Sequence, residues 1–154
     1  MRRTWPWFLA AAGIVLVDRV TKWAVLGWLR PGEAVEVTPF FNFVLVFNRG
    51  AAFSFLADAP GWQTPLFAAV AIIAAAVVSW MLWRNPAKHL LCAGLALILG
   101  GALGNLWDRL QWGAVADFLD FHAFGWHWPA FNVADSAIVV GAAILILESF
   151  LHKD

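Results

Sequence analysis

Several aspartates stand inside or beside long apolar runs, an unusual place for an acid: Asp18, Asp108, Asp117 and Asp135. A charge at membrane depth costs roughly 2.5–3.5 kcal/mol on insertion scales, so such residues most often have a function. Two carboxyl groups that meet where the dielectric is low share one proton. One can then act as a general base on water while the other donates a proton to a carbonyl oxygen, which is aspartic-protease chemistry.

Each of these polar groups also has a structural interpretation. Asp18 and Lys22 are four residues apart, so they share a helix face and can neutralise each other. Asn105, Asp108 and Arg109 form one polar face, which an ordinary helix end in the membrane interface could carry. The presence of Asn105 beside the two charges favours a site that faces inward.

The segments around the other two aspartates leave similar alternatives open. Asn132 is a good N-cap, and the helix dipole favours an ionised Asp135 three residues later. Asp117 and Asp120 could be solvated loop carboxylates, although large apolar residues flank them. Spacing alone does not decide whether Asp117 or Asp120 meets Asp135. Asn48, together with the two asparagines already named, could gather at the same depth.

A metal site is the weaker chemical alternative. His122 and His127, with Asp117 or Asp120, could in principle bind zinc. Their separation of five residues does not place both histidines on one helix face, unlike the i, i+4 pair of zinc peptidases. We therefore expect neither a metal site nor a cofactor.

Composition defines the kind of element that must position these residues. The chain has 154 residues, of which 62% are hydrophobic and only 13% charged. A soluble domain is about 25% charged, so a soluble enzyme, a disordered chain and a disulfide scaffold are excluded. Ten basic and ten acidic residues cancel, which predicts no nucleic-acid partner. The length fits one domain, residues 1–154.

The apolar runs predict an all-α membrane protein with four transmembrane helices, because a bilayer core needs about 20 apolar residues. The predicted spans are residues 7–29, 65–83, 89–107 and 134–151. The first would be an uncleaved span, since no small-residue cleavage site follows its apolar run. Gly101 and its neighbouring glycines would let another helix approach the third span closely.

The connections predict a small β-sheet element between the first two spans, over residues 31–63. Residues 43–47 and 51–55 read as two strands joined by a turn at Asn48-Arg49-Gly50. The aromatic-rich stretch 110–131 is expected to lie against the membrane interface. Lys and Arg concentrate on the side of both termini, which predicts cytoplasmic termini and an acid-rich outer boundary.

Five segments in this order resemble those of the bacterial lipoprotein signal peptidases, or signal peptidases of type II. Asp18-Arg19-Val20-Thr21-Lys22 is similar to the family's Asp-x-x-Thr/Ser-Lys, and Asn48 to Phe53 to its Asn-x-Gly-Ala-Ala-Phe. Gly100 to Arg109 resembles its glycine-rich stretch ending in Gly-Asn-x-x-Asp-Arg. Val115 to Asp120 and Phe131 to Asp135 resemble the segments that carry its two catalytic aspartates.

The resemblance implies that Asp117 and Asp135 are a catalytic dyad. It implies supporting or substrate-binding roles for Asp18, Lys22, Asn48, Gly101, Asn105, Asp108, Arg109 and Asn132. The implied enzyme is an aspartyl endopeptidase that cleaves diacylglyceryl-modified prolipoproteins immediately before the lipidated cysteine. It would work as a monomer in the bacterial inner membrane, in contact with lipid, with its site at the extracytoplasmic face. Phe43, Phe53 and Phe55 are candidates to cover the lipidated segment.

Two other classes of protein remain open from the residues alone. Intramembrane acids also mark ion paths, so a small proton- or cation-coupled transporter is the main alternative. Its acids should lie across the membrane or near its midplane, whereas here they cluster at one boundary. A membrane scaffold without activity is the third possibility, and it would give the acid cluster no purpose.

Overall fold

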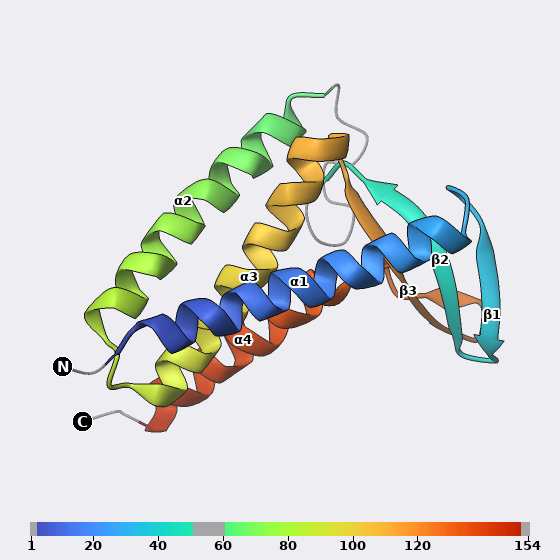
Figure 1. The fold of residues 1–154 in the computed structure, drawn as a ribbon. Coiled ribbons are helices and arrows are strands. Elements are labelled where there is room, and N and C mark those ends of the chain that lie inside the picture. Colours follow the sequence, from blue (N-terminus) through green and yellow to red (C-terminus); the bar gives the residue numbers. More distant parts are fainter. Residues whose placement is uncertain (1–2, 51–60, 152–154) are drawn as a thin grey trace.

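The computed structural model describes residues 3–50 and 61–151 (Figure 1). These residues form four long helices and one small antiparallel sheet. The elements in chain order are α1 (Trp5–Trp28), β1 (Ala34–Thr38), β2 (Phe41–Asn48), α2 (Gln63–Arg84), α3 (His89–Trp112), β3 (Val115–Ala123), β4 (Trp126–His127) and α4 (Val133–Leu151). The four helices match the four predicted apolar segments to within a few residues at most ends.

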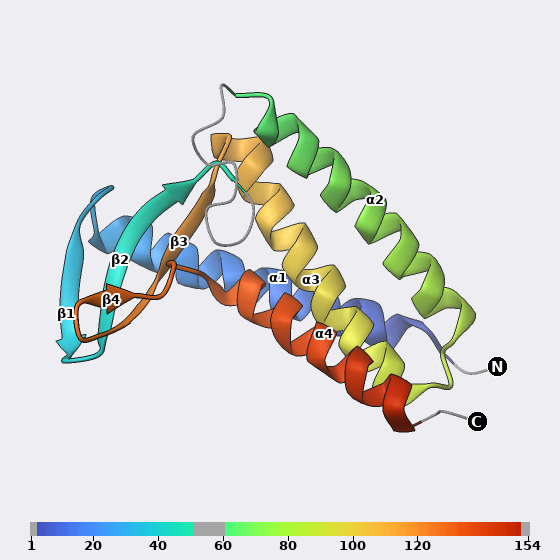
Figure 2. The same ribbon diagram turned by 180° about the vertical axis from the view of Figure 1, so that it is seen from behind.

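Helix α3 lies at the centre of the bundle and packs against α1, α2 and α4 (Figure 2). Its glycines make this possible, because a Cβ at Gly100 would lie 2.6 Å from the Cβ of Ile14 on α1. A Cβ at Gly101 would overlap the carbonyl oxygen of Ala134 on α4. Small residues let helix backbones approach where no large side chain fits between them.

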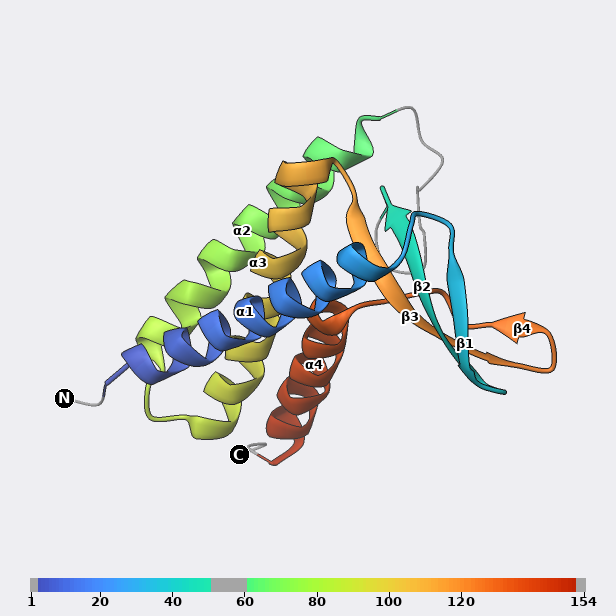
Figure 3. The same ribbon diagram turned by 45° about the vertical axis from the view of Figure 1, so that its right-hand side comes forward.

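The apolar core has two parts. Ala11, Leu82, Cys92, Leu95 and Leu99 belong to a cluster that joins α1, α2 and α3 near the end of the bundle that carries the termini. A second cluster, which includes Val25, Leu29, Leu45 and Phe118, joins the end of α1 to the sheet. The second cluster fixes the sheet against the bundle at the end away from both termini (Figure 3).

The sheet has the strand order β1-β2-β3-β4, and every neighbouring pair is antiparallel. Strands β1 and β2 both lie within residues 31–63, where a small β-sheet element was expected. The second strand predicted there, over residues 51–55, lies outside the described residues. Asn48 ends β2, and its side-chain oxygen accepts a hydrogen bond from the Gly50 backbone N–H at 2.8 Å, as expected for a turn.

The stretch 110–131, for which no strand was predicted, contributes two of the four strands of the sheet. Residues Val115 to Phe118 are all buried, since β3 lies between β2 on one edge and the bundle on its face. A strand that is covered on both faces shows no alternation of polar and apolar residues, so the pattern that revealed β1 and β2 is missing here. Asp117 is consequently a strand residue, not a loop residue.

Among the described residues, α2, α3 and α4 are long and apolar enough to cross a membrane. Helix α1 has the length but carries Asp18, Arg19 and Lys22 within its middle. Helix α3 continues five residues beyond the predicted end of its span, to Trp112. The apolar pattern placed the end of the span before Asp108 and Arg109, because these residues are charged. The helix continues through them, since both bond to partners outside α3.

Candidate active site

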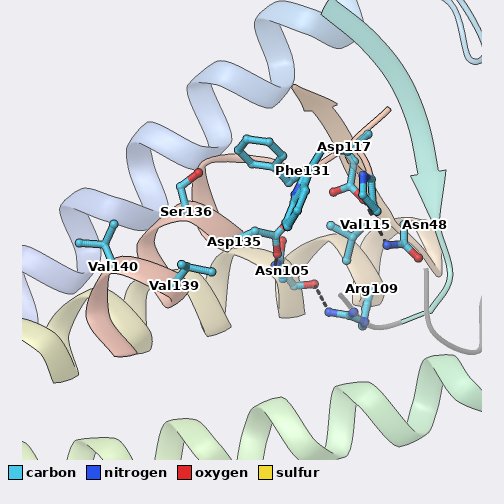
Figure 4. A pocket seen from close by; sticks show the side chains of 13 residues that line it. Asn48, Asn105, Arg109, Val115, Asp117, Phe131, Asp135, Ser136, Val139 and Val140 are labelled. Atoms are coloured by element: carbon cyan, nitrogen blue, oxygen red, sulfur yellow. Dashed lines mark hydrogen bonds between the residues drawn. The ribbon is translucent and has the colours of Figure 1, made fainter. Parts of the chain in front are cut away.

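A cavity of about 420 Å³ lies where β2, β3, α3 and α4 meet (Figure 4). Its polar lining residues are Asn48, Asn105, Arg109, Asp117, Asp135 and Ser136. Val139 and Val140 of α4 form part of its apolar wall, and both are exposed on the outside of the bundle. The cavity therefore combines a polar floor with a wall that continues onto the apolar surface of α4.

Asp117 enters the cavity from β3 and is only 3% exposed. Its two carboxyl oxygens accept hydrogen bonds from the side-chain amides of Asn132, at 2.7 Å, and Asn48, at 3.2 Å. Burial raises the pKa of Asp117 from its ordinary 3.8 to about 7, with a further contribution from the neighbouring charge of Asp135, although both amides and Lys22 oppose the shift. The raised pKa allows this carboxyl group to hold a proton near neutral pH.

Asp135 enters the same cavity from the first turn of α4. The Asp135 backbone N–H donates to the side-chain oxygen of Asn132 at 2.9 Å, and the Asn132 backbone N–H donates back to Asp135 Oδ2 at 3.2 Å. This is a reciprocal cap of the helix end. The second oxygen, Asp135 Oδ1, accepts from the Asn105 amide at 2.7 Å. We call Asp117 and Asp135 the carboxyl pair.

Asparagine side chains connect the two members of the carboxyl pair. The Asn132 amide donates to Asp117, and it also lies 3.2 Å from Asn105 Oδ1. Asn105 in turn donates to Asp135 and accepts from Lys22 Nζ at 3.1 Å. The carboxyl groups are thus held by neutral amides, and Lys22 bonds to the amide of Asn105 and not to an acid of the pair.

Arg109 closes the cavity on the side of β2. Its guanidinium donates to the Gly50 carbonyl at 2.9 Å and to the Asn105 carbonyl at 3.4 Å, and it lies over the ring of Phe67 at 5.6 Å. Within residues 3–50 and 61–151 its buried Nε has no hydrogen-bond partner. Arg109 therefore ties β2 to α3 and offers a positive charge to the cavity.

A second group of charges lies directly behind the cavity, between α1 and α3. It consists of Asp18, Arg19, Lys22 and Asp108, all of them buried, and we call it the charge cluster. Lys22 Nζ lies 2.9 Å from Asp18 Oδ2 and 2.7 Å from Asp108 Oδ2, and Arg19 bonds to Asp108. The other oxygen of Asp18 accepts the Ala134 backbone N–H at 3.1 Å, which attaches α1 to the start of α4.

Asp120, the alternative partner of Asp135 left open by the sequence, lies apart from the cavity lining. It bonds to His127 Nδ1 at 2.9 Å and to the Asn42 amide at 2.8 Å. Its separation from Asp117 is three residues, and an odd separation along a strand turns side chains to opposite faces. The described residues contain no group of three or more His, Cys, Asp or Glu side chains that could hold a metal ion.

The structure brings most of the predicted site residues into one connected network. Asn48, Asn105, Asn132 and Arg109 bond within or around the carboxyl pair, Asp18, Lys22 and Asp108 form the charge cluster, and Gly101 contacts Ala134 at the start of α4. Phe43 packs against the rings of Trp28 and Phe41 and is not among the cavity residues, while Phe53 and Phe55 lie outside the described residues.

Sequence reasoning missed Arg19. It gave no role to this residue because neighbouring residues on a helix point about 100° apart, so Asp18 and Arg19 do not share a face. Its guanidinium carbon lies 5.9 Å from the ring of Trp107 and 5.4 Å from that of Trp112. The one available signal was that Arg19 adds a third charge to an apolar helix in which Asp18 and Lys22 already neutralise each other.

Comparison with known proteins assigns the chain to a family. Residues 10–151 match the family of signal peptidase (SPase) II. The chain is 56% identical over 143 residues to the lipoprotein signal peptidase of Paraburkholderia phytofirmans and 52% identical to that of Ralstonia nicotianae, in both cases over 93% of this chain and 83% of the relative.

Solved structures of bacterial membrane enzymes share the fold. One has a TM-score of 0.84 at 29% identity, over 97% of this chain and 90% of that chain. Another has a TM-score of 0.81 at 31% identity, over 97% and 94%. A family match over nearly the whole chain, relatives at more than half identity and a shared membrane-enzyme fold lead to one conclusion: the chain belongs to the signal peptidase II family of membrane peptidases.

Proposed function

We propose that the chain is an aspartyl endopeptidase that cleaves diacylglyceryl-modified prolipoproteins immediately before the lipidated cysteine, with Asp117 and Asp135 as its catalytic residues. The observation that carries the assignment is the carboxyl pair itself: the buried Asp117 and the half-buried Asp135 line one cavity, bond to neutral amides and share Asn132 as a common partner. Family membership supports this hydrolase and gives no support to a transporter.

In the first step, a water molecule between the two acids loses a proton to the carboxylate of Asp135. Its oxygen attacks the carbonyl carbon of the scissile peptide bond, and protonated Asp117 donates its proton to the carbonyl oxygen. The raised pKa of Asp117 keeps this carboxyl group protonated for much of the time at neutral pH. The product of the step is a neutral tetrahedral gem-diol.

In the second step, the gem-diol collapses. One hydroxyl returns its proton to Asp117, the C–N bond breaks, and Asp135 passes its proton to the amine of the lipidated cysteine. Both acids are then in their starting protonation states, so no net proton is consumed by the pair. Asn105 and Asn132 hold the two carboxyl groups in place through bonds of 2.7 Å during both steps.

The proposal places all four long helices across the bacterial inner membrane, with both termini in the cytoplasm and the cavity at the extracytoplasmic boundary. Helix α1 can cross despite its charges because the charge cluster contains two acids and two bases, all buried. The sheet would cover the outer end of the bundle, where it faces water.

The cavity suits a substrate that is anchored in the membrane. Its wall of Val139 and Val140 continues onto the exposed apolar surface of α4, which would face lipid. A lipidated segment could therefore reach the carboxyl pair sideways without crossing water. We propose that residues 1–154 act as one peptidase domain and that one copy of the chain, as a monomer in lipid, suffices for activity.

The proposed activity can be tested with purified protein in detergent and a lipid-modified preprolipoprotein. We expect a single cut before the lipidated cysteine, unchanged by a chelator, as read by mass spectrometry of both products. The same substrate without its diacylglyceryl group should be cut far more slowly. Cleavage elsewhere, or cleavage that stops when a chelator is added, would contradict the proposal.

A further inference from the structure

Arg19 differs from the other members of the charge cluster because it makes few hydrogen bonds for a buried arginine. It is 4% exposed, and its Nη2 serves both Asp108 and Asp18, the latter at 3.4 Å. Among the described residues, its buried Nε and Nη1 have no hydrogen-bond partner. A buried cation with unused donors is costly, so its position calls for an explanation.

Two tryptophans account for part of that cost. Trp107 and Trp112, both on α3, lie with their ring centroids 5.9 Å and 5.4 Å from the Arg19 guanidinium carbon. The faces of aromatic rings attract a cation, and guanidinium stacks on them better than ammonium does. The rings fix the orientation of the guanidinium, which bonds to Asp108.

Asp108 transmits this contact to the carboxyl pair. Its Oδ1 accepts from Arg19, while its Oδ2 accepts from the Ala116 backbone N–H at 3.1 Å and also lies 2.7 Å from Lys22 Nζ. Ala116 directly precedes Asp117 on β3, and its carbonyl accepts from the Asn132 amide at 3.4 Å. Arg19 therefore stands at the start of a continuous path that ends at the residue before the acid.

Charge balance supports the same connection. Asp18 and Asp108 carry two negative charges, and Lys22 and Arg19 carry two positive ones, so the cluster is neutral. Without Arg19, Lys22 alone would face two carboxylates, and its contact with Asn105 at 3.1 Å would compete with them. Asn105 holds Asp135, so the disturbance would reach both members of the carboxyl pair.

We propose that Arg19 is a positioning residue of the peptidase, which holds Asp108 on the backbone of β3 and keeps the charge cluster neutral behind the carboxyl pair. This inference rests on the proposed catalytic roles of Asp117 and Asp135. Lys22 does not duplicate this role, because only a planar guanidinium can stack on the rings of Trp107 and Trp112 and also bond to the carboxylate of Asp108.

The test compares Arg19→Gln and Arg19→Lys with the wild type, with kcat and KM measured from pH 5 to pH 9. Arg84→Gln is the matched control, because Arg84 also lies over a tryptophan ring, that of Trp80 at 5.9 Å. Arg84 is the last residue of α2, and this helix ends at the other end of the bundle (Figure 1). For Arg19→Gln we expect kcat to fall about tenfold with KM nearly unchanged, since no substrate contact is lost.

The pH dependence of kcat distinguishes a positioning role from a structural one, because a purely structural role of Arg19 would leave its alkaline limb unchanged. The charged groups whose fields reach Asp117 are Asp135 on α4, Lys22 on α1 and Arg109 on α3, so Arg19 acts on Asp117 through Lys22. Without Arg19, the two carboxylates of the cluster draw Lys22 away from the carboxyl pair, and the weaker positive field disfavours ionisation of Asp117. The alkaline limb of the Arg19→Gln profile should therefore move up by roughly half a pH unit. Arg19→Lys should restore the limb to its wild-type position but recover only part of kcat.

Each result decides the inference. A profile of Arg19→Gln that coincides with the wild type would overturn it, and so would a lower kcat with an unmoved alkaline limb. If Arg19→Gln does not fold, Arg19→Lys decides alone, because wild-type kcat in that variant would contradict the need for a guanidinium. Asp117→Asn separates the two proposals. If Asp117→Asn keeps its activity, the proposed function itself is wrong. If Asp117→Asn is inactive while Arg19→Gln has wild-type kcat and pH profile, only the role of Arg19 is wrong.

Discussion

The charge cluster and the carboxyl pair are neighbours that meet at Asn105, which bonds to Lys22 and to Asp135, yet their acids have opposite surroundings. Asp18 and Asp108 each bond to a cation, at 2.9 Å and 2.7 Å from Lys22 Nζ. Asp117 and Asp135 bond to amides and backbone N–H groups and line an open cavity. The charge cluster is buried and its charges balance, whereas the two acids of the carboxyl pair line the same cavity.

The difference separates structural acids from chemical ones. A buried carboxylate that is paired with a cation is stable without a proton. The bonds of Asp18 and Asp108 hold α1, α3, β3 and α4 together. A buried carboxyl group that lacks a bonded cation and faces another acid must share protons with it. The arrangement predicts that mutations of Asp18, Lys22 and Asp108 mainly change stability and that mutations in the carboxyl pair mainly change rate. Arg19 is the exception, because the role proposed for it above affects the rate as well.

The strongest test of this division is to remove one carboxylate of the pair. Asp117→Asn and Asp135→Asn should each lower kcat by roughly 10²–10⁴-fold or more, because the general acid or base is lost, while the protein stays folded and inserted. Activity on a lipid-modified preprolipoprotein and thermal unfolding in detergent provide the two measurements. Asp120→Asn is the matched control on the same strand and should stay within a few-fold of wild-type activity.

Removal of a cation from the charge cluster should have the converse effect. Lys22→Met leaves Asp18 and Asp108 buried with Arg19 as their remaining partner, so the free energy of unfolding should fall by about 3–5 kcal/mol. Lys88→Met, which removes an exposed lysine before α3, should change it by less than about 0.5 kcal/mol. A Lys22→Met protein with wild-type thermal stability would mean that the cluster does not hold the bundle.

The two groups should also differ in their response to pH. Asp117 has a pKa of about 7 in the folded protein and about 3.8 in the unfolded chain, so the folded state binds its proton more tightly. Its contribution to stability is therefore complete below about pH 4 and is lost as the pH rises through about 7, by on the order of a few kcal/mol. Thermal unfolding of Asp117→Asn should lack this decline, and the wild-type kcat should fall above about pH 7. An identical pH dependence of stability in both proteins would contradict the raised pKa.

Two glycines of α3 give the finest comparison, because each faces a different group. A Cβ at Gly104 would lie 2.7 Å from Asp18 Oδ2, and one at Gly101 would overlap the Ala134 carbonyl beside Asp135. Both Gly104→Ala and Gly101→Ala should cost at least about 1–3 kcal/mol of stability, because each added Cβ overlaps a neighbouring atom. Only Gly101→Ala should also lower kcat several-fold, by shifting α4 against Asn105. Gly27→Ala is the control, since nothing lies within 4 Å of a Cβ there. An equal fall of kcat in both variants would remove the division.

The positions of the helices and most of the residues that line or surround the cavity could be predicted from the sequence, because both have local signatures. Apolar runs of membrane length are visible without tertiary contacts, and Asn132 with Asp135 reads as a helix cap. The strand β3 was not predicted, because its buried residues lack alternation. Neither the exclusion of Asp120 nor the role of Arg19 could be predicted, since both depend on which face of β3 and α1 meets α3. Those contacts join residues far apart in the chain, such as Arg19 and Asp108, and no local spacing encodes them.

The reciprocal cap of α4 makes the register of a helix and the chemistry of an enzyme inseparable. The stretch from Phe124 to Ala130 is irregular apart from β4, so a change in its length can be absorbed before Asn132. An insertion between Asn132 and Asp135 would instead turn Asp135 by about 100° around the helix axis and break both capping bonds at once. Insertions and deletions among relatives should accordingly occur between Phe124 and Ala130 and should not occur between Asn132 and Asp135.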